Sequence, residues 1–108
     1  MAVVLLKNNK YRPLPDNITI KESKIEGLGL FTIKSIEDKK ILGVSHVKNG
    51  KGYWRTPLGG FINHSNNPNC IKKENEFTKN LYLETIMPIK KEEELTVKYT
   101  LYKINNNG

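Results

Sequence analysis

The segment from Phe61 to Cys70, FINHSNNPNC, contains the side chains best suited to chemistry in this sequence. His64, Ser65 and Cys70 are residue types of nucleophilic hydrolases, in which a base lies within hydrogen-bond distance of the nucleophile. Neighbouring side chains on an extended segment point to opposite faces, so adjacency does not make His64 and Ser65 a dyad. No G-x-S-x-G motif surrounds Ser65, and no known pattern marks Cys70 as a nucleophile. We therefore do not expect hydrolase chemistry.

The same segment also has the composition of a turn. Asparagine side chains mimic backbone hydrogen bonds and proline fixes φ, so such residues gather in turns without any functional reason. We predict a turn from Asn66 to Asn69, whatever the role of the residues before it.

Two other short motifs could contact a ligand or a metal. Gly27-Leu28-Gly29 lacks the third glycine and the following helix of a dinucleotide-binding fingerprint, although glycines allow a ligand to approach the backbone closely. The acidic run Glu92–Glu94 is most typical of a solvated turn, and it lacks the partners of a metal site. One cysteine and two histidines cannot build a closed structural zinc site. We predict no bound metal.

Composition indicates one small globular domain. The chain has 108 residues, of which 37% are hydrophobic and 27% charged. The net charge of +7 raises the possibility of nucleic-acid binding. Only Arg12 and Arg55 among the 18 basic residues are arginine, which dominates base recognition. We therefore do not expect nucleic-acid binding. It remains an alternative because aromatic and basic residues, Tyr53, Trp54 and Arg55, occur together near several lysines. We expect the two aromatic rings to pack in the core or at its rim.

The chain's opening and its cysteine content bear on the cellular compartment. MAVVLLKNNK has six apolar residues before Lys7, too few for a signal-peptide core or a membrane span. A single cysteine excludes an internal disulfide and suits a reducing compartment. We predict an intracellular protein, in the cytoplasm or in the nucleus of a eukaryotic host, with no membrane partner.

The elements that must position these motifs are short strands joined by turns. No long helical period appears, so the predicted fold class is mostly β. We expect an irregular arm over residues 1–17, a hairpin at Asn49-Gly50 with Gly52, and a polar loop after Cys70. The predicted strands are NITIKES from Asn17, IEGLGLFTIKSI from Ile25, Ile41–Val47, Leu81–Met87 and ELTVKYTLY from Glu94.

One internal similarity suggests two related β units. LFTIKSIEDKKIL, from Leu30, and LETIMPIKKEEEL, from Leu83, share L-x-T-I-x-x-I and a charged run before an apolar residue, 53 positions apart. Each has the pattern of a strand, a polar turn and a second strand. Coincidence in a biased composition is the alternative.

Three segments in this order resemble the SET-domain protein lysine methyltransferases. The family pattern runs G-x-G-hydrophobic-Phe, then F-I-N-H-S-x-x-P-N, then G-E-E-L-T-hydrophobic-x-Y. This chain has GLGLF from Gly27, FINHSNNPNC from Phe61 and EEELTVKY ending at Tyr99. The resemblance covers about residues 18–102 and implies a SET domain over 18–104 with a tail at 105–108. It also implies a β-clip-like fold of short curved sheets with a knot-like C-terminal segment, closest to the minimal SET proteins of large viruses and phages.

The resemblance also implies an activity and a set of site residues. The activity is methyl transfer from S-adenosylmethionine to a protein lysine, which requires in-line alignment of donor and amine more than proton relay. A narrow apolar channel favours the neutral amine, because desolvation lowers its pKa. By matched position, the backbone of Gly27, Leu28 and Gly29 would contact the cofactor. Asn63 would contact the amino-acid end of the cofactor, and His64 would contact its adenine. Tyr99 would be catalytic, and the substrate channel would be lined by Phe61, Leu101 and Tyr102.

Several departures from the family pattern define further expectations. Lys98 stands where Asp usually precedes the catalytic tyrosine, and Lys39 and Glu92 replace turn glycines. Only 36 residues separate Gly27 from Asn63, so the insert that usually forms one wall of the substrate groove is much reduced. A second subunit could complete that wall, and we predict a homodimer. The same departures keep a non-catalytic SET-like binding or assembly module as the alternative function.

Overall fold

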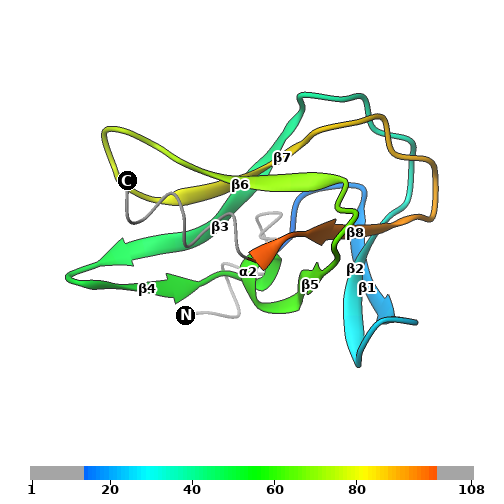
Figure 1. The fold of residues 1–108 in the computed structure, drawn as a ribbon, viewed down its shortest axis with the longest axis horizontal. Coiled ribbons are helices and arrows are strands. Elements are labelled where there is room, and N and C mark those ends of the chain that lie inside the picture. Colours follow the sequence, from blue (N-terminus) through cyan, green and yellow to red (C-terminus); the bar gives the residue numbers. More distant parts are fainter. Residues whose placement is uncertain (1–13, 100–108) are drawn as a thin grey trace, which may run out of the picture.

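The computed structural model describes residues 14–99, and within them the chain is almost entirely short strands (Figure 1). The fold class predicted from the sequence is confirmed. Helix is limited in this range to the short α2 and to Tyr99, which also has a helical conformation. The elements are β1 Ile18–Glu22, β2 Leu28–Thr32, β3 Ile41–Asn49, β4 Gly52–Arg55, α2 Pro57–Phe61, β5 Asn63–His64, β6 Cys70–Glu74, β7 Leu81–Thr85 and β8 Glu94–Val97.

The strands form two four-stranded sheets. One has the order β1-β2-β8-β5 and the other β4-β3-β7-β6. The pairings are antiparallel except between β5 and β8, which run parallel with Asn63 opposite Thr96 and His64 opposite Val97. This parallel pair joins the FINHSNNPNC segment to the strand before Tyr99, so two of the three sequence motifs meet there.

The core lies between the two sheets and under α2. Pro57 opens this helix, and the Thr56 hydroxyl caps it by accepting a hydrogen bond from Gly59 N. The buried cluster takes residues from both sheets and from the helix: Ile18, Leu30, Leu58, Ile62, Cys70, Leu83, Ile89, Leu95 and Val97. Within residues 14–99 no helix has the length and apolar character needed to span a membrane.

The structure corrects three details of the predicted elements. The strand predicted from Glu94 to Tyr102 ends at Val97, since Lys98 lies outside the strand and Tyr99 has a helical conformation. The loop predicted after Cys70 begins with β6, which pairs with β7 over its whole length. Helix α2 was not predicted, since five residues cannot display a helical period.

The internal similarity corresponds to a real structural relation. The unit that starts at Leu30 runs from β2 in one sheet to β3 in the other, and the unit that starts at Leu83 runs back from β7 to β8. The two connections therefore lie side by side and antiparallel (Figure 1). At the crossing, Ile36 and Ile89 exchange two backbone hydrogen bonds of 2.8 Å. The two β units are therefore packed against each other.

Candidate functional site

The Asn63 side chain is the centre of a polar cluster built from three distant segments. Its amide nitrogen lies 2.9 Å from Glu94 Oε2 and 3.1 Å from Ser23 Oγ. It also donates to the backbone carbonyls of Glu26 and Leu28, at 3.1 and 3.2 Å. The Ser23 hydroxyl in turn lies 2.9 Å from both oxygens of the Glu94 carboxylate. The loop that carries the Gly27-Leu28-Gly29 motif is thus tied to β5 and β8.

The two glycines of this motif are required for different structural reasons. Gly27 has a φ of +47°, which side chains rarely adopt, and it closes the turn by accepting a hydrogen bond from Ser23 N at 2.8 Å. Gly29 is packed against the cluster: a Cβ there would lie 2.9 Å from Glu94 Cδ and 3.1 Å from Asn63 Nδ2. Leu28 between them is 48% exposed. Gly27 and Leu28 are thus exposed near Asn63, whereas Gly29 is buried against its side chain.

Strand β5 lies at the edge of its sheet, and this decides where its backbone groups point. Ser65 N donates to Val97 O at 2.9 Å, so Ser65 and Asn63 direct their backbone groups toward β8. The N–H and C=O of His64 then point away from β8, because successive residues of a strand alternate. A ligand at this edge can use both groups.

The His64 ring positions Tyr99. Backbone N of Tyr99 donates to His64 Nδ1 at 3.0 Å, and the ring centroids are 4.9 Å apart. Because Nδ1 accepts, the neutral ring carries its proton on Nε2, which lies 3.3 Å from Asn66 Oδ1. The Tyr99 hydroxyl donates to the carbonyl of Ile62 at 3.0 Å. This gives the His64 side chain a role that sequence reasoning missed.

The Asn69 side chain extends the connection between the motif and β8. Its Oδ1 accepts from Thr96 N and its Nδ2 donates to Glu94 O, both at 2.9 Å. It thereby replaces a pair of backbone hydrogen bonds where β5 has already ended. The turn predicted at 66–69 is present as bends, with Asn67 N donating to Ser65 Oγ at 3.0 Å.

The residues set aside as nucleophiles are not placed for such chemistry. The Cys70 side chain is fully buried, and burial raises the pKa of its thiol to about 12. The Ser65 hydroxyl serves the turn. Among residues 14–99, no three His, Cys, Asp or Glu side chains are grouped to hold a metal ion.

Two predicted channel residues, Leu101 and Tyr102, lie outside the described residues, as does the chain after Tyr99 that the knot-like arrangement requires. The third, Phe61, is the last residue of α2 and packs against the core cluster. The structure therefore describes Phe61 and Tyr99 of the predicted channel.

Sequence reasoning missed Ser23, Glu94 and Asn69 as parts of the cluster. The expectation that the whole acidic run is a solvated turn is wrong for Glu94, which lies in β8 with its carboxylate on Ser23 and Asn63. Its partners are 31 and 71 residues away, so no local pattern could reveal them. Glu92 and Glu93 are exposed, as expected.

The cluster contains donors and acceptors that suit S-adenosylmethionine. The hydrogen bonds described for the Asn63 side chain use its nitrogen, so its oxygen can accept from an ammonium group. The Glu94 carboxylate favours a nearby cation, and the outward backbone groups of His64 match the donor and acceptor edge of a purine. A separate cleft of about 690 Å³ lies over β3, β7 and the β6–β7 hairpin. None of the predicted site residues lines it, so we place the candidate site at the Asn63 cluster, where the motifs meet.

Comparisons with known proteins agree with this architecture. The model of the SET domain family matches residues 44–100. A candidate histone methyltransferase of Plasmodium falciparum shares the fold at 22% identity, with a TM-score of 0.63 over 77% of this chain and 92% of that one. The methyltransferase domain of human PR domain-containing protein 2 does so at 19% identity and a TM-score of 0.60, over 78% of this chain and 77% of that one.

A humanized mutant of the Chaetomium thermophilum Polycomb Repressive Complex 2, bound to the inhibitor GSK126, is similar at 20% identity and a TM-score of 0.65. The similarity covers 79% of this chain but 15% of that one. A search of curated proteins found no significant match. The family model matches more than half of the sequence, and the matched range includes Asn63, Glu94 and the β5–β8 pair: the chain belongs to the SET domain family.

Proposed function

We propose that this SET domain transfers a methyl group from S-adenosylmethionine to the side chain of a protein lysine. The observation that carries the proposal is the convergence of Gly29, Asn63 and Glu94 beside the β5–β8 pair, which leads directly to Tyr99. In this proposal Gly27, Leu28 and Gly29 offer backbone, Asn63 holds the amino-acid end of the cofactor, and His64 holds the adenine.

The residues around Tyr99 are suited to orienting an amine. When bound, S-adenosylmethionine supplies an electrophilic methyl group on a sulfonium. The Tyr99 hydroxyl donates a hydrogen bond to Ile62 O, so the lone pairs of its oxygen can accept a hydrogen bond from the substrate amine. His64 fixes the backbone of Tyr99, and Phe61 extends the apolar wall. Alignment of this kind supplies much of the catalysis when no proton relay is needed.

Three finer features belong to the same proposal. The domain spans 18–104 between a short arm and a tail, and it is of the minimal viral or phage type. It acts as a homodimer, because the chain between Gly27 and Asn63 is too short to wall the substrate groove alone. Leu101 and Tyr102 complete the channel.

Calorimetric titration of S-adenosylmethionine and of S-adenosylhomocysteine tests cofactor use. We expect binding, with weaker affinity in Asn63→Ala. No binding at millimolar cofactor would contradict the proposal and favour the non-catalytic binding or assembly module.

Tyr99→Phe tests the catalytic role. We expect methylation of proteins in a cell extract, followed with labelled cofactor and mass spectrometry, to fall by roughly a hundredfold or more, since the acceptor loses its orienting group. Cofactor affinity should change little. Tyr82→Phe, the same chemical change on β7, should leave both unchanged, and undiminished turnover in Tyr99→Phe would remove the assignment.

A further inference from the structure

Lys72 is a lysine buried in the core-facing side of a strand. Along β6, Cys70 and Lys72 point inward, and Lys72 is only 9% exposed. The next residue, Lys73, points outward, and its ammonium lies 3.4 Å from Glu84. Lysine is almost never buried without a specific environment for its charge. The environment of Lys72 is therefore informative.

The ammonium of Lys72 lies on the face of the proposed catalytic tyrosine. Nζ is 5.3 Å from the centroid of the Tyr99 ring, within the range of a cation–π interaction. The same ring contacts His64, and its hydroxyl is fixed on Ile62 O. An amine of this chain thus lies over the ring of Tyr99, the residue that the proposed function assigns to orienting the amine of a substrate lysine.

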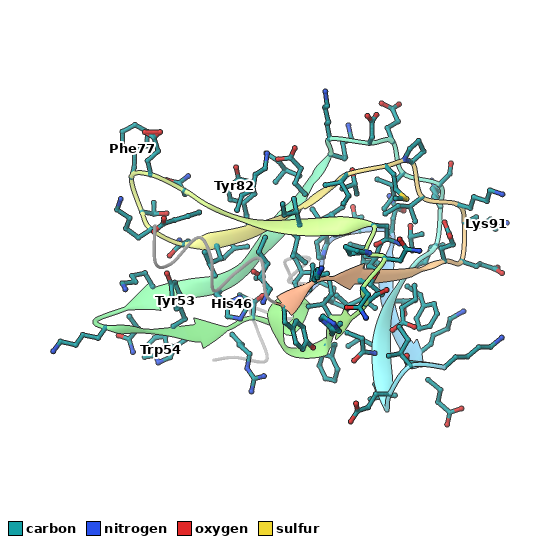
Figure 2. The ribbon with its side chains drawn as sticks, viewed as in Figure 1. His46, Tyr53, Trp54, Phe77, Tyr82 and Lys91 are labelled. Atoms are coloured by element: carbon teal, nitrogen blue, oxygen red, sulfur yellow. The ribbon has the colours of Figure 1, made fainter. Side chains whose placement is uncertain are left out.

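The surroundings also favour the nucleophilic form of this amine. Burial lowers the pKa of Lys72, because the interior disfavours the charged ammonium. The positive charges of Lys72 and Arg55 both lower the pKa of His46. The His46 ring makes an edge contact with the Tyr53 ring, with their centroids 6.1 Å apart (Figure 2). The burial of Lys72 therefore raises the neutral fraction of its amine relative to an exposed lysine.

We propose that Lys72 is an internal methyl acceptor, a self-methylation site whose Nζ takes the place of a substrate lysine beside Tyr99. This inference rests on the proposed function. The Lys72 ammonium first releases a proton to water. The lone pair of Nζ then forms a bond to the methyl carbon, the S–C bond of the methylsulfonium donor breaks, and its electron pair remains on sulfur. The products are a methylated ammonium and a neutral thioether.

The tether makes this reaction competitive with any external substrate. Strand β6 holds Lys72 beside β7 through paired residues, so its amine does not have to be captured from solution. Reactions within one molecule gain large effective concentrations when the geometry is suitable. Tyr99 itself is 45% exposed, so a lysine from another protein would compete with Lys72 for the same ring.

The test uses the purified full chain with S-adenosylmethionine carrying a deuterated methyl group and no other protein. Peptide mass spectrometry should find the label on Lys72, at a rate independent of protein concentration. Lys72→Arg keeps a long cation without an acceptor amine and should lose this label, whereas the matched neighbour Lys73→Arg should keep it. Label that avoids Lys72, or a rate that rises in proportion to protein concentration, would overturn the inference.

A second measurement examines the site without turnover. In NMR spectra of the free protein, the Lys72 side-chain methylene next to Nζ should be shifted by the ring current of Tyr99, and Tyr99→Leu should remove this shift. An ordinary position in the unmodified chain would contradict the geometry. If the cofactor binds and lysines of other proteins are methylated while Lys72 is not, this inference fails and the proposed function stands. If no cofactor binds, both fail.

Discussion

Gly29 is the residue at which the site leaves no room for a side chain. The atoms closest to a Cβ at this position would belong to Glu94 and Asn63, both of which are held by their own hydrogen bonds. The clash cannot be relieved without moving the Glu94 carboxylate off Ser23. The glycine is therefore required by close approach rather than by a special backbone angle.

We expect Gly29→Ala to lower the free energy of unfolding by about 1–3 kcal/mol, as overpacking does elsewhere, and to weaken cofactor binding. Urea denaturation and calorimetry measure the two effects. Gly60→Ala is the control, since no heavy atom lies within 4 Å of a Cβ there. A Gly29→Ala variant as stable as Gly60→Ala would mean that the cluster is less tightly held than described.

His46 is a buried titratable residue outside the proposed site. Its ring nitrogen Nδ1 lies 2.9 Å from Ser45 Oγ. Burial, with the positive charges of Lys72 and Arg55, lowers its pKa from 6.5 to about 4. In the folded protein the ring is therefore neutral at neutral pH.

This predicts a loss of stability in acid. Between pH 6.5 and 4 the unfolded chain protonates His46 and the folded chain does not, so the stability present above pH 6.5 is lost toward pH 4. The contribution is about 2–3 kcal/mol. Denaturation at a series of pH values should show a shallower slope in His46→Gln, and an unchanged slope would place the pH dependence elsewhere.

The two crossing connections are related element by element. Thr32 O accepts from Glu92 N at 2.7 Å, and the matching Thr85 O accepts from Lys39 N at 2.8 Å. Lys39 and Glu92 occupy equivalent positions and both have positive φ, +58° and +69°. The crossing thus has an approximate two-fold symmetry, and its two turns require the same left-handed backbone.

These turns predict stabilising substitutions. A residue with a side chain is about 1 kcal/mol less stable in the left-handed region than glycine. Glycine recovers this energy only in part, because it also makes the unfolded chain more flexible. We expect Lys39→Gly and Glu92→Gly each to raise the free energy of unfolding by about 0.5 kcal/mol in urea denaturation. Lys91→Gly, in the same turn without positive φ, should lower it. The reverse order would contradict the assigned conformations.

At the scale of the whole molecule, the described surface carries exposed apolar side chains on β3 and β4. Trp54 is 65% exposed and lies on β4 beside Tyr53 (Figure 2). It pairs across the hairpin with Val47, which is 37% exposed. Both rings were expected to pack in the core or at its rim, but Trp54 is largely exposed on the β3–β4 hairpin, whereas Tyr53 contacts His46 and Lys48. Such a patch is a candidate contact between subunits.

The exposed patch around Trp54 provides a test of the predicted homodimer. Light scattering at micromolar concentration should give about twice the chain mass of 12.4 kDa. Trp54→Ser should shift the protein toward monomer, while Met87→Ser, an exposed apolar residue of the β7–β8 connection, should not. A monomeric unmodified protein would contradict the prediction.

The sequence by itself determined the types and order of the site residues, the mostly β fold class, most of the strands and the Asn49-Gly50 hairpin. These depend on local properties: strand propensity, alternation and the backbone freedom of glycine. The extent of β8 and the presence of β6 did not follow, because apolar alternation in the sequence continues past Val97, where the strand ends, and packing overrides the polar composition of β6.

Only the tertiary structure decided which of these residues meet. Glu94 joins Ser23 across 71 positions, the two similar units cross at Ile36 and Ile89, and Lys72 reaches the ring of Tyr99. Each contact depends on strand order and register, which long-range packing sets and no local pattern records. The motifs indicate the residues of the candidate site, and the pairing of β5 with β8 brings them together.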